Sequence, residues 1–192
     1  GTPPRGGTIY LTTADANGMM VSLIQSNYMG FGSGVVVPGY GISLQNRGVG
    51  FSMDPASANV VAPGKRPFHT IIPAFVMKDG QPAMSYGVMG GNMQPQGHVQ
   101  TLVRMLLAMQ QPQAACDAPR WKVMTGLNVE VEGSMPPAVV DELRRRGHHL
   151  MSANDSYMDF GSGQFIWRLG DPAVDGYVAA SDSRRDGLAA GY

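Results

Sequence analysis

Two turn signals in the first half of the chain do most to restrict its fold. One is Asn17-Gly18 and the other is Asp79-Gly80. Asn-Gly and Asp-Gly steps supply the positive φ angles that tight hairpin turns need. Each step lies between two β-rich runs, which are residues 8–14, 19–26, 71–77 and 82–88. The sequence therefore predicts two antiparallel hairpins.

The rest of the chain adds two helices and several short strands. Residues 95–110 carry apolar side chains at the i, i+3, i+4 spacing of a helix. Residues 136–146 predict a second helix, whose end is marked by basic residues and Gly147. Further strand candidates are residues 35–37, 42–46, 128–131, 163–169 and 176–180, and residues 53–67 are expected to form a long loop. No internal repeat interrupts this order, so we expect one α+β layered domain.

Charge and cysteine content exclude several classes of protein. The chain has 14 Lys and Arg against 14 Asp and Glu, so it has no excess of positive charge that would bind a phosphate backbone or an anionic membrane. A single cysteine, Cys116, excludes an internal disulfide and a thiolate zinc site. No apolar run approaches the ~20 residues of a spanning helix. We expect no nucleic-acid partner and no membrane segment in this chain.

The low charge content also bears on partners. Charged residues make up 15% of the chain, against a usual share of roughly 25%. Such a composition favours a large interface with another polypeptide, and the 14 methionines suit an irregular contact surface. A Gly-rich and Met-rich β core is the alternative explanation.

Most sequence signatures of catalysis are absent. The chain has no HExxH, no GxxxxGK[ST] and no GxSxG pattern. The glycine-rich residues 30–34 precede a valine run, whereas a dinucleotide site needs a helix there. We therefore expect no cofactor and no metal.

Thr8 is the residue type and position that best fit a nucleophile. It opens the first predicted strand after a Pro- and Gly-rich lead, residues 1–7. Cleavage of the Gly7–Thr8 bond would give Thr8 an α-amine that can act as base for its own hydroxyl. Gly90 and Gly91, before the helix at residues 95–110, could present two backbone N–H groups to a developing oxyanion. A strand-opening threonine and a glycine pair in a turn are also ordinary structural features.

Several segments together resemble the small, C-terminal subunit of γ-glutamyltransferases. The resemblance runs in order through essentially residues 8–192. It is carried by residues 8–15, residues 26–34, Pro63-Gly64-Lys65-Arg66-Pro67, Gly90-Gly91, Ala118-Pro119-Arg120, Ala180-Ser181-Asp182 and Ala190-Gly191-Tyr192.

The resemblance implies a precursor that cleaves itself before a threonine. Its two subunits would form the four-layer αββα sandwich of N-terminal-nucleophile hydrolases, with a large subunit completing this chain. Thr8 resembles the nucleophile, Ser26 stands where a threonine hydroxyl usually supports it, and Gly90 with Gly91 resemble the oxyanion hole. The implied reaction is cleavage of γ-glutamyl amides such as glutathione, with transfer of the acyl group to water, an amino acid or a peptide.

This chain departs from the family at the positions that grip the substrate α-amino group. An Asn, a Gln and an Asp are replaced by Tyr28, Arg47 and Gly50. A cation at Arg47 would repel an ammonium and attract a carboxylate. These changes resemble the cephalosporin acylase-like branch, whose substrates are glutaryl-type amides without the α-amine. Arg47 could equally be a solvated surface charge.

The paired serines after Lys-Arg-Pro are replaced by His69 and Thr70, which we place with Tyr28 and Arg47 as candidate substrate-binding residues. For His69 itself, burial against a backbone carbonyl is the alternative. Histidines 98, 148 and 149 have no evident partners in the sequence. Asp182 and Arg184 are expected to form a structural ion pair.

These observations predict a self-processing N-terminal threonine amidohydrolase or acyltransferase, with residues 1–7 before the cleavage point and residues 8–192 as the small-subunit domain. The alternatives are a glutaryl-type amide hydrolase and an unprocessed, non-catalytic scaffold. Seven residues precede Thr8 here and block its amine.

Overall fold

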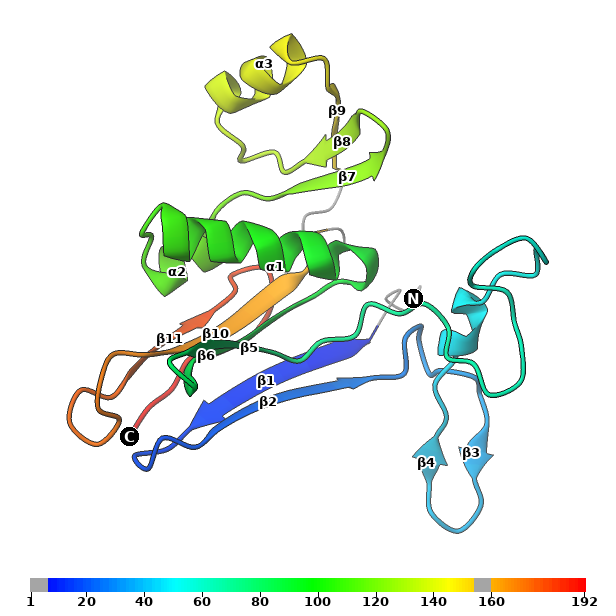
Figure 1. Cartoon of the computed structure of the whole chain (residues 1–192), viewed down its shortest axis with the longest axis horizontal. Helices are drawn as coiled ribbons and strands as arrows, with labels where there is room; N and C mark the ends of the chain where they lie inside the picture. The colour runs from blue at the N-terminus through cyan, green and yellow to red at the C-terminus, as the bar shows by residue number, and fades with distance from the viewer. Residues whose placement is uncertain (1–6, 154–159) are drawn as a thin grey trace.

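The computed structural model describes residues 7–153 and 160–192. Of the expected lead before the cleavage point, Gly7 is described and residues 1–6 are not. The described chain is built in layers: helices lie on one face of a β-sheet, and a separate hairpin lies on the other (Figure 1).

The hairpin consists of β1 (Thr8–Ala14) and β2 (Met20–Ser26), which pair antiparallel as predicted. Its turn depends on Gly18, whose φ is +86°. The Asp15 carboxylate accepts two backbone N–H groups of the same turn, at 2.9 and 3.0 Å. The turn therefore forms from local interactions that the sequence encodes directly.

A four-stranded antiparallel sheet in the order β11-β10-β6-β5 lies next to the hairpin. Its strands are β5 (Ala74–Lys78), β6 (Gln81–Met89), β10 (Ser162–Arg168) and β11 (Tyr177–Ser181). The second predicted hairpin and the closing pair of strands are thus confirmed. The first of these strands begins three residues later than predicted, directly after Pro73, which has no N–H to donate to a ladder.

Alternate residues of β1 face the sheet. Thr12 Oγ1 donates to Ser85 Oγ of β6 at 2.6 Å, and Tyr10 is buried between the layers. On the opposite face of β1, the side chains of Ile9 and Leu11 are exposed. The period of two along the strand therefore places the Thr8 side chain on the same face as Tyr10 and Thr12.

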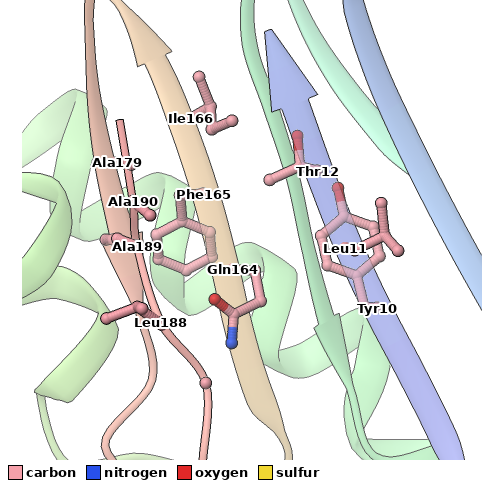
Figure 2. A pocket seen from close by; sticks show the side chains of 12 residues that line it. Tyr10, Leu11, Thr12, Gln164, Phe165, Ile166, Ala179, Leu188, Ala189 and Ala190 are labelled. Atoms are coloured by element: carbon pink, nitrogen blue, oxygen red, sulfur yellow. The ribbon is translucent and has the colours of Figure 1, made fainter. Parts of the chain in front are cut away.

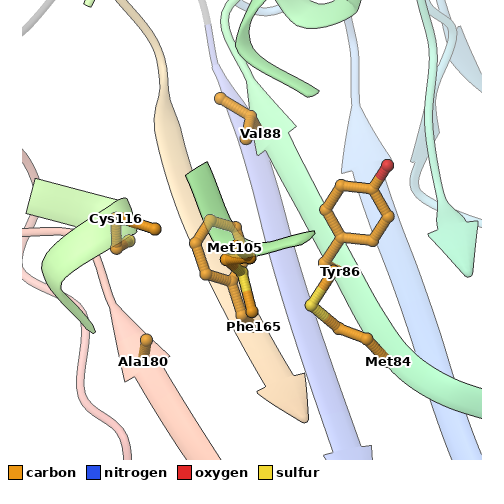
Figure 3. Close-up of a cluster of buried hydrophobic side chains, with 8 residues drawn as sticks. Met84, Tyr86, Val88, Met105, Cys116, Phe165 and Ala180 are labelled. Carbon is orange, nitrogen blue, oxygen red and sulfur yellow. The ribbon is translucent and has the colours of Figure 1, made fainter. Parts of the chain in front are cut away.

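The helical layer consists of α1 (Gln94–Leu102), a π-helical turn η3 (Val103–Leu107) and the short α2 (Pro112–Asp117). The first two confirm the predicted helix, which ends three residues before the expected position, and α2 was not predicted. The main core lies between this layer and the sheet (Figure 3). Its buried residues are Met84, Tyr86, Val88, Met105, Ala115, Cys116, Phe165 and Ala180.

Most of the apolar stripe of the first helix faces away from the core, although Leu102 packs against it. The exposed members of the stripe are Val99, Val103, Leu106 and Leu107. The fully buried residues of α1 are small or polar. At Gly97 an added Cβ would lie 2.7 Å from Val88 Cγ1, so the close approach of helix and sheet requires glycine.

A second lobe follows on the far side of α1 (Figure 1). It contains β7 (Trp121–Thr125), β8 (Asn128–Val131), α3 (Pro137–Arg145) and β9 (His149–Ser152), in the sheet order β7-β8-β9. The strand at β8 and the helix at α3 were predicted, whereas β7 and β9 were not. Val129, Val131 and Met135 form its small core.

The segment between the two predicted hairpins forms a third region. It contains β3 (Val36–Val37), β4 (Ile42–Ser43) and the 3-10 turn η1 (Arg47–Gly50). β4 is shorter than the strand predicted over residues 42–46. Its chain leaves the pair because Asn46 N–H donates to Asn27 O at 3.2 Å, which starts η1 beside the end of β2.

The described part of the chain is α+β, with a helix layer, a sheet and a hairpin stacked in that order (Figure 1). Residues 53–67 are mostly loop, as predicted. Within the described residues, none of the helices combines the length and the apolar character needed to cross a membrane.

Candidate active site

The site begins with two hydroxyl groups at the open end of the first hairpin. The register of β1 and β2 places Thr8 directly opposite Ser26. Thr8 Oγ1 and Ser26 Oγ lie 2.9 Å apart, within hydrogen-bond distance. Eighteen residues separate them in the chain, so the hairpin turn alone brings this pair together.

Ser26 Oγ has two further partners. It accepts the backbone N–H of Tyr28 at 2.9 Å and the Arg47 Nη2–H at 2.9 Å. Tyr28 has a φ of +75°, which is uncommon for a bulky residue and is held only when the surroundings over-determine it. The backbone leaving β2 therefore folds back around the serine hydroxyl.

Arg47 is the charged residue of this site. Its side chain is 9% exposed, and its guanidinium carbon lies 4.9 Å from the centre of the Tyr28 ring. Burial lowers the pKa of Arg47, while the nearby Tyr28 opposes the change. Because the group is buried and hydrogen-bonded, the explanation of Arg47 as a solvated surface charge is wrong. It remains a cation at neutral pH.

Arg47 is placed by the turn that contains it. Its N–H donates to the Gln45 side chain, and the preceding Asn46 ties the turn to the loop after β2. Asn46 Oδ1 accepts Met29 N–H at 3.0 Å, and its Nδ2 donates to Met29 O and Gly32 O at 3.2 and 3.1 Å. These bonds fix η1 next to the Thr8–Ser26 pair.

Gly90 and Gly91 form the turn between β6 and the helical layer. Both have positive φ, +133° and +56°. An added Cβ on Gly90 would lie 2.8 Å from Gly161 Cα, while Gly91 has open space around it. Among the described residues, neither glycine N–H has a hydrogen-bond acceptor. The turn thus holds two backbone donors without partners at the start of the η2 (Gly91–Met93) and α1 segments.

The packing of β1 on β6 brings this turn to the Thr8 end of the hairpin. Thr12 contacts Ser85, and an added Cβ on Gly87 would meet the Tyr10 ring at 2.7 Å. The two strands therefore run antiparallel in adjacent layers. Each step of two residues back along β1 matches a step of two residues forward along β6, so Thr8 lies over Met89 at the end of β6. The glycine turn begins at the next residue.

His69 and Thr70 lie on a segment that crosses between these two parts. Phe68 N–H donates to Asn59 Oδ1 at 2.8 Å, and Asn59 Nδ2 donates to Gly50 O at 2.5 Å, beside η1. Ile72 N–H donates to Gln94 Oε1 at 3.3 Å, at the start of α1. Residues 69–70 lie between these anchors, and in the described part of the chain no hydrogen bond joins either of them to Thr8, Ser26 or Arg47.

The structure also corrects two expectations about histidines. His69 is exposed, and its Nδ1 accepts Ile71 N–H at 3.4 Å, so the expectation of a buried histidine is wrong. His98 is buried and has partners, because its Nδ1 lies 2.6 Å from Gln94 O and its Nε2 accepts Val88 N–H at 3.3 Å. His149 also has a partner, because its Nδ1 lies 3.2 Å from Asn128 Oδ1. The sequence pattern alone contained no signal for these contacts.

The expected ion pair between Asp182 and Arg184 is confirmed at 3.1 Å, and it belongs to a larger buried network. Arg120 Nη2 lies 2.7 Å from Asp182 Oδ2, and Arg184 also pairs with Glu132. Arg120 donates to Phe160 O and Gly161 O at 3.0 and 3.1 Å. Gly161 packs against Gly90, so this network fixes the backbone against which the glycine turn lies.

A cleft of about 270 Å³ lies elsewhere, between β1 and the C-terminal residues (Figure 2). Gln164 and Phe165 of β10 and Leu188 of the C-terminal segment line it. It includes none of the candidate catalytic residues. Among the described residues, no group of three or more His, Cys, Asp or Glu side chains could hold a metal ion.

Comparison with known proteins identifies a family and similar proteins. The family model described as gamma-glutamyltranspeptidase matches residues 1–192. The oxamate amidohydrolase proenzyme of Klebsiella pneumoniae is 38% identical over 97% of this chain and 36% of its own length. The chain thus spans about a third of the length of that curated relative.

Two solved structures have the same fold. Cephalosporin acylase from Bacillus halodurans superposes with a TM-score of 0.86 at 50% identity, covering 95% of this chain and 34% of that one. Gamma-glutamyltranspeptidase from Pseudomonas nitroreducens, complexed with L-DON, superposes with a TM-score of 0.80 at 25% identity, covering 95% of this chain and 98% of that one.

Proposed function

Because the chain belongs to the gamma-glutamyltranspeptidase family, we propose that it supplies the N-terminal threonine nucleophile of a self-processing amide hydrolase. The fold is the α+β fold of the N-terminal-nucleophile hydrolases. The observation that carries the proposal is the hydroxyl pair of Thr8 and Ser26, 2.9 Å apart at the start of the first strand. In this proposal Thr8 is the nucleophile, and residues 1–7 end the segment that is cut away.

The first reaction is cleavage of the precursor at Gly7–Thr8. Thr8 Oγ1 attacks the Gly7 carbonyl carbon, an ester bond forms, and the Gly7–Thr8 amide bond breaks. The hydroxyl proton passes to the departing Thr8 nitrogen. Water then hydrolyses the ester, which leaves a Gly7 carboxylate and a free Thr8 amine.

The second reaction uses that amine. With a pKa of about 7.7 to 8.0, an α-amine takes the hydroxyl proton readily near neutral pH. Oγ1 attacks the substrate amide, and the N–H groups of Gly90 and Gly91 stabilise the oxyanion. The protonated amine returns the proton to the leaving nitrogen. Water, an amino acid or a peptide then takes the acyl group from Thr8.

Arg47 indicates the kind of acyl group. Its guanidinium donates to Ser26, which touches Thr8, so a cation lies beside the nucleophile. A substrate carboxylate would bind there, whereas an α-ammonium would be repelled. We therefore favour the monoamide of a dicarboxylic acid, such as a glutaryl amide, with Tyr28 and Arg47 binding its carboxylate. The names of two relatives, an oxamate amidohydrolase and a cephalosporin acylase, agree with an acyl group of this type.

A γ-glutamyl amide such as glutathione is the second candidate substrate. The family itself and the relative from P. nitroreducens support it. In either case His69 and Thr70 would form the rim of the acyl pocket, because their segment joins η1 to the start of α1. The rest of the precursor, as a large subunit, would complete the site.

Intact mass measurement of the full-length precursor tests the nucleophile. We expect wild-type protein to separate into two chains, the smaller beginning at Thr8, and Thr8→Ala to stay intact. The processed enzyme is then offered a glutaryl and a γ-glutamyl anilide at equal concentration, and we expect faster release of the chromophore from the glutaryl compound. An intact wild-type precursor would leave this chain a non-catalytic scaffold.

A further inference from the structure

Ser26 Oγ lies at the centre of three hydrogen-bonding neighbours. Tyr28 N, Arg47 Nη2 and Thr8 Oγ1 are each 2.9 Å from it. The first two can only donate, because a backbone N–H and a guanidinium have no acceptor atom on nitrogen. A serine hydroxyl has two lone pairs and one proton. Tyr28 and Arg47 therefore both donate to Ser26 Oγ, which acts as acceptor in this cluster.

The third bond comes from Thr8, whose Oγ1–H donates to Ser26 Oγ. The position of Ser26 Oγ, and with it the position of the Thr8 hydroxyl, is set by the donors of Tyr28 and Arg47. We propose that Arg47 is a positioning residue, which together with Tyr28 N–H holds Ser26 Oγ where it accepts the Thr8 Oγ1–H. This inference rests on the proposed role of Thr8 as nucleophile.

This arrangement favours the chemistry at Thr8 in two ways. A hydrogen bond to a fixed acceptor holds the Thr8 side chain in one orientation and keeps the lone pairs of Oγ1 available for attack. The Arg47 cation beside Ser26 also stabilises the negative charge that grows on Oγ1 as the proton leaves.

The position of Arg47 suits this role. Its side chain is held between the Tyr28 ring and Ser26, and the hydrogen bonds of Asn46 fix the turn that carries it. Only Nη2 donates to Ser26. Within residues 7–153 and 160–192, no hydrogen bond occupies the other guanidinium N–H groups, so the same residue can also bind a substrate carboxylate.

Self-cleavage separates the two purposes of Arg47. Cleavage of Gly7–Thr8 uses the same nucleophile as the turnover of substrate but involves no substrate carboxylate. Loss of a carboxylate-binding group would therefore slow turnover alone. Loss of a positioning group that acts through Ser26 would slow self-cleavage as well.

The experiment is a double-mutant cycle on self-cleavage of the full-length precursor, made by cell-free translation so that cleavage starts at a known time. The variants are Arg47→Met, Ser26→Ala and the two combined, with Arg47→Lys as the conservative change. Ser26→Thr is the matched control, because it keeps the hydroxyl. The rate is followed by intact mass, and circular dichroism and urea unfolding of each precursor verify folding.

We expect Arg47→Met to slow self-cleavage by about tenfold or more, and Arg47→Lys to restore part of the rate. In the Ser26→Ala background, Arg47→Met should cause no further loss, since its effect passes through the missing hydroxyl. In the Ser26→Thr background it should slow cleavage as in wild type.

Three outcomes would overturn the inference. Wild-type cleavage rates in Arg47→Met would limit Arg47 to substrate binding. Equal losses from Arg47→Met with and without the Ser26 hydroxyl would indicate a general structural role, as would a loss matched by a fall in stability. A wild-type precursor that never cleaves would instead refute the proposed function, so the two failures are distinguishable.

Discussion

At the scale of single residues, the site depends on side chains whose partners are distant in the sequence. The contact between Thr8 and Ser26 was expected from the family resemblance, and the register of the Asn-Gly hairpin accounts for it. The contact between Arg47 and Ser26 was not, since it depends on how a loop of some twenty residues closes. For the same reason the sequence did not predict that Arg120 and Glu132 join Asp182 and Arg184 in one buried network.

His98 provides a residue-scale prediction for the pH dependence of stability. Burial lowers the pKa of His98, the Gln94 carbonyl opposes the change, and the charge of Arg120 adds to it. The folded protein therefore holds the neutral ring, which accepts Val88 N–H through Nε2. Its contribution is complete above the unfolded pKa of about 6.5 and is lost as the pH falls through the lower folded value.

We expect the thermal midpoint of the processed protein to fall between pH 7 and pH 5 more steeply in wild type than in His98→Gln. The difference should correspond to about 1 kcal/mol, the net value of one hydrogen bond. His149→Gln is the matched control for loss of an imidazole, because this side chain is exposed and lies on β9, outside the core that encloses His98. Parallel curves for wild type and His98→Gln would contradict the assignment.

At the scale of elements, local signals predicted well and non-local ones did not. Both Gly-containing turns produced their hairpins, and α3 ended at its basic cluster as expected. The edge strands β7 and β9 were not predicted, because each is specified by its pairing with β8 and not by its own composition. The exposed apolar side chains of α1 and η3 are another feature that local signals did not predict. Helical spacing predicted the helix, but it does not say which side meets the sheet.

The glycine turn between β6 and α1 gives an element-scale prediction. Gly90 combines a φ of +133° with backbone atoms of Gly161 in the place of a Cβ, whereas Gly91 has a φ of +56° and free space. We expect Gly90→Ala to cost about 3 kcal/mol of stability and Gly91→Ala about 1 kcal/mol. The proposed oxyanion donors, the N–H groups of Gly90 and Gly91, move with the backbone, so we expect kcat to fall about a hundredfold in Gly90→Ala and much less in Gly91→Ala.

Thermal unfolding and anilide hydrolysis of the two processed variants measure these effects. The pair is its own control, because each change adds one methyl group to neighbouring positions of the same turn. Equal losses of stability and kcat in the two variants would mean that the close approach of Gly161 to Gly90 does not determine the turn geometry.

At the scale of the whole molecule, both outer faces of the layered structure are apolar. The far face of the hairpin carries Ile9, Leu11, Val21 and Leu23, each exposed by 40% or more. The far face of the helical layer carries the stripe of α1 and η3. The low charge content of the sequence is consistent with these faces. The methionines are divided, since Met84 and Met105 fill the core while others lie on the surface. Both explanations offered for the composition thus have support in the structure.

The hairpin face allows the whole-molecule argument to be tested. Leu11 and Leu23 are directly opposed across β1 and β2, and we expect the remainder of the precursor to cover them as the fourth layer. Burying a leucine contributes about 1.5 to 3 kcal/mol, so Leu11→Asp with Leu23→Asp should weaken the association of the two processed chains by a hundredfold or more. Val174→Asp, on an exposed loop, should leave association unchanged. Size-exclusion chromatography in graded urea measures the separation of the chains. If the double variant stays associated at the same urea concentration as wild type, this face is solvent-exposed in the mature protein, and the apolar stripe of α1 becomes the contact to test next.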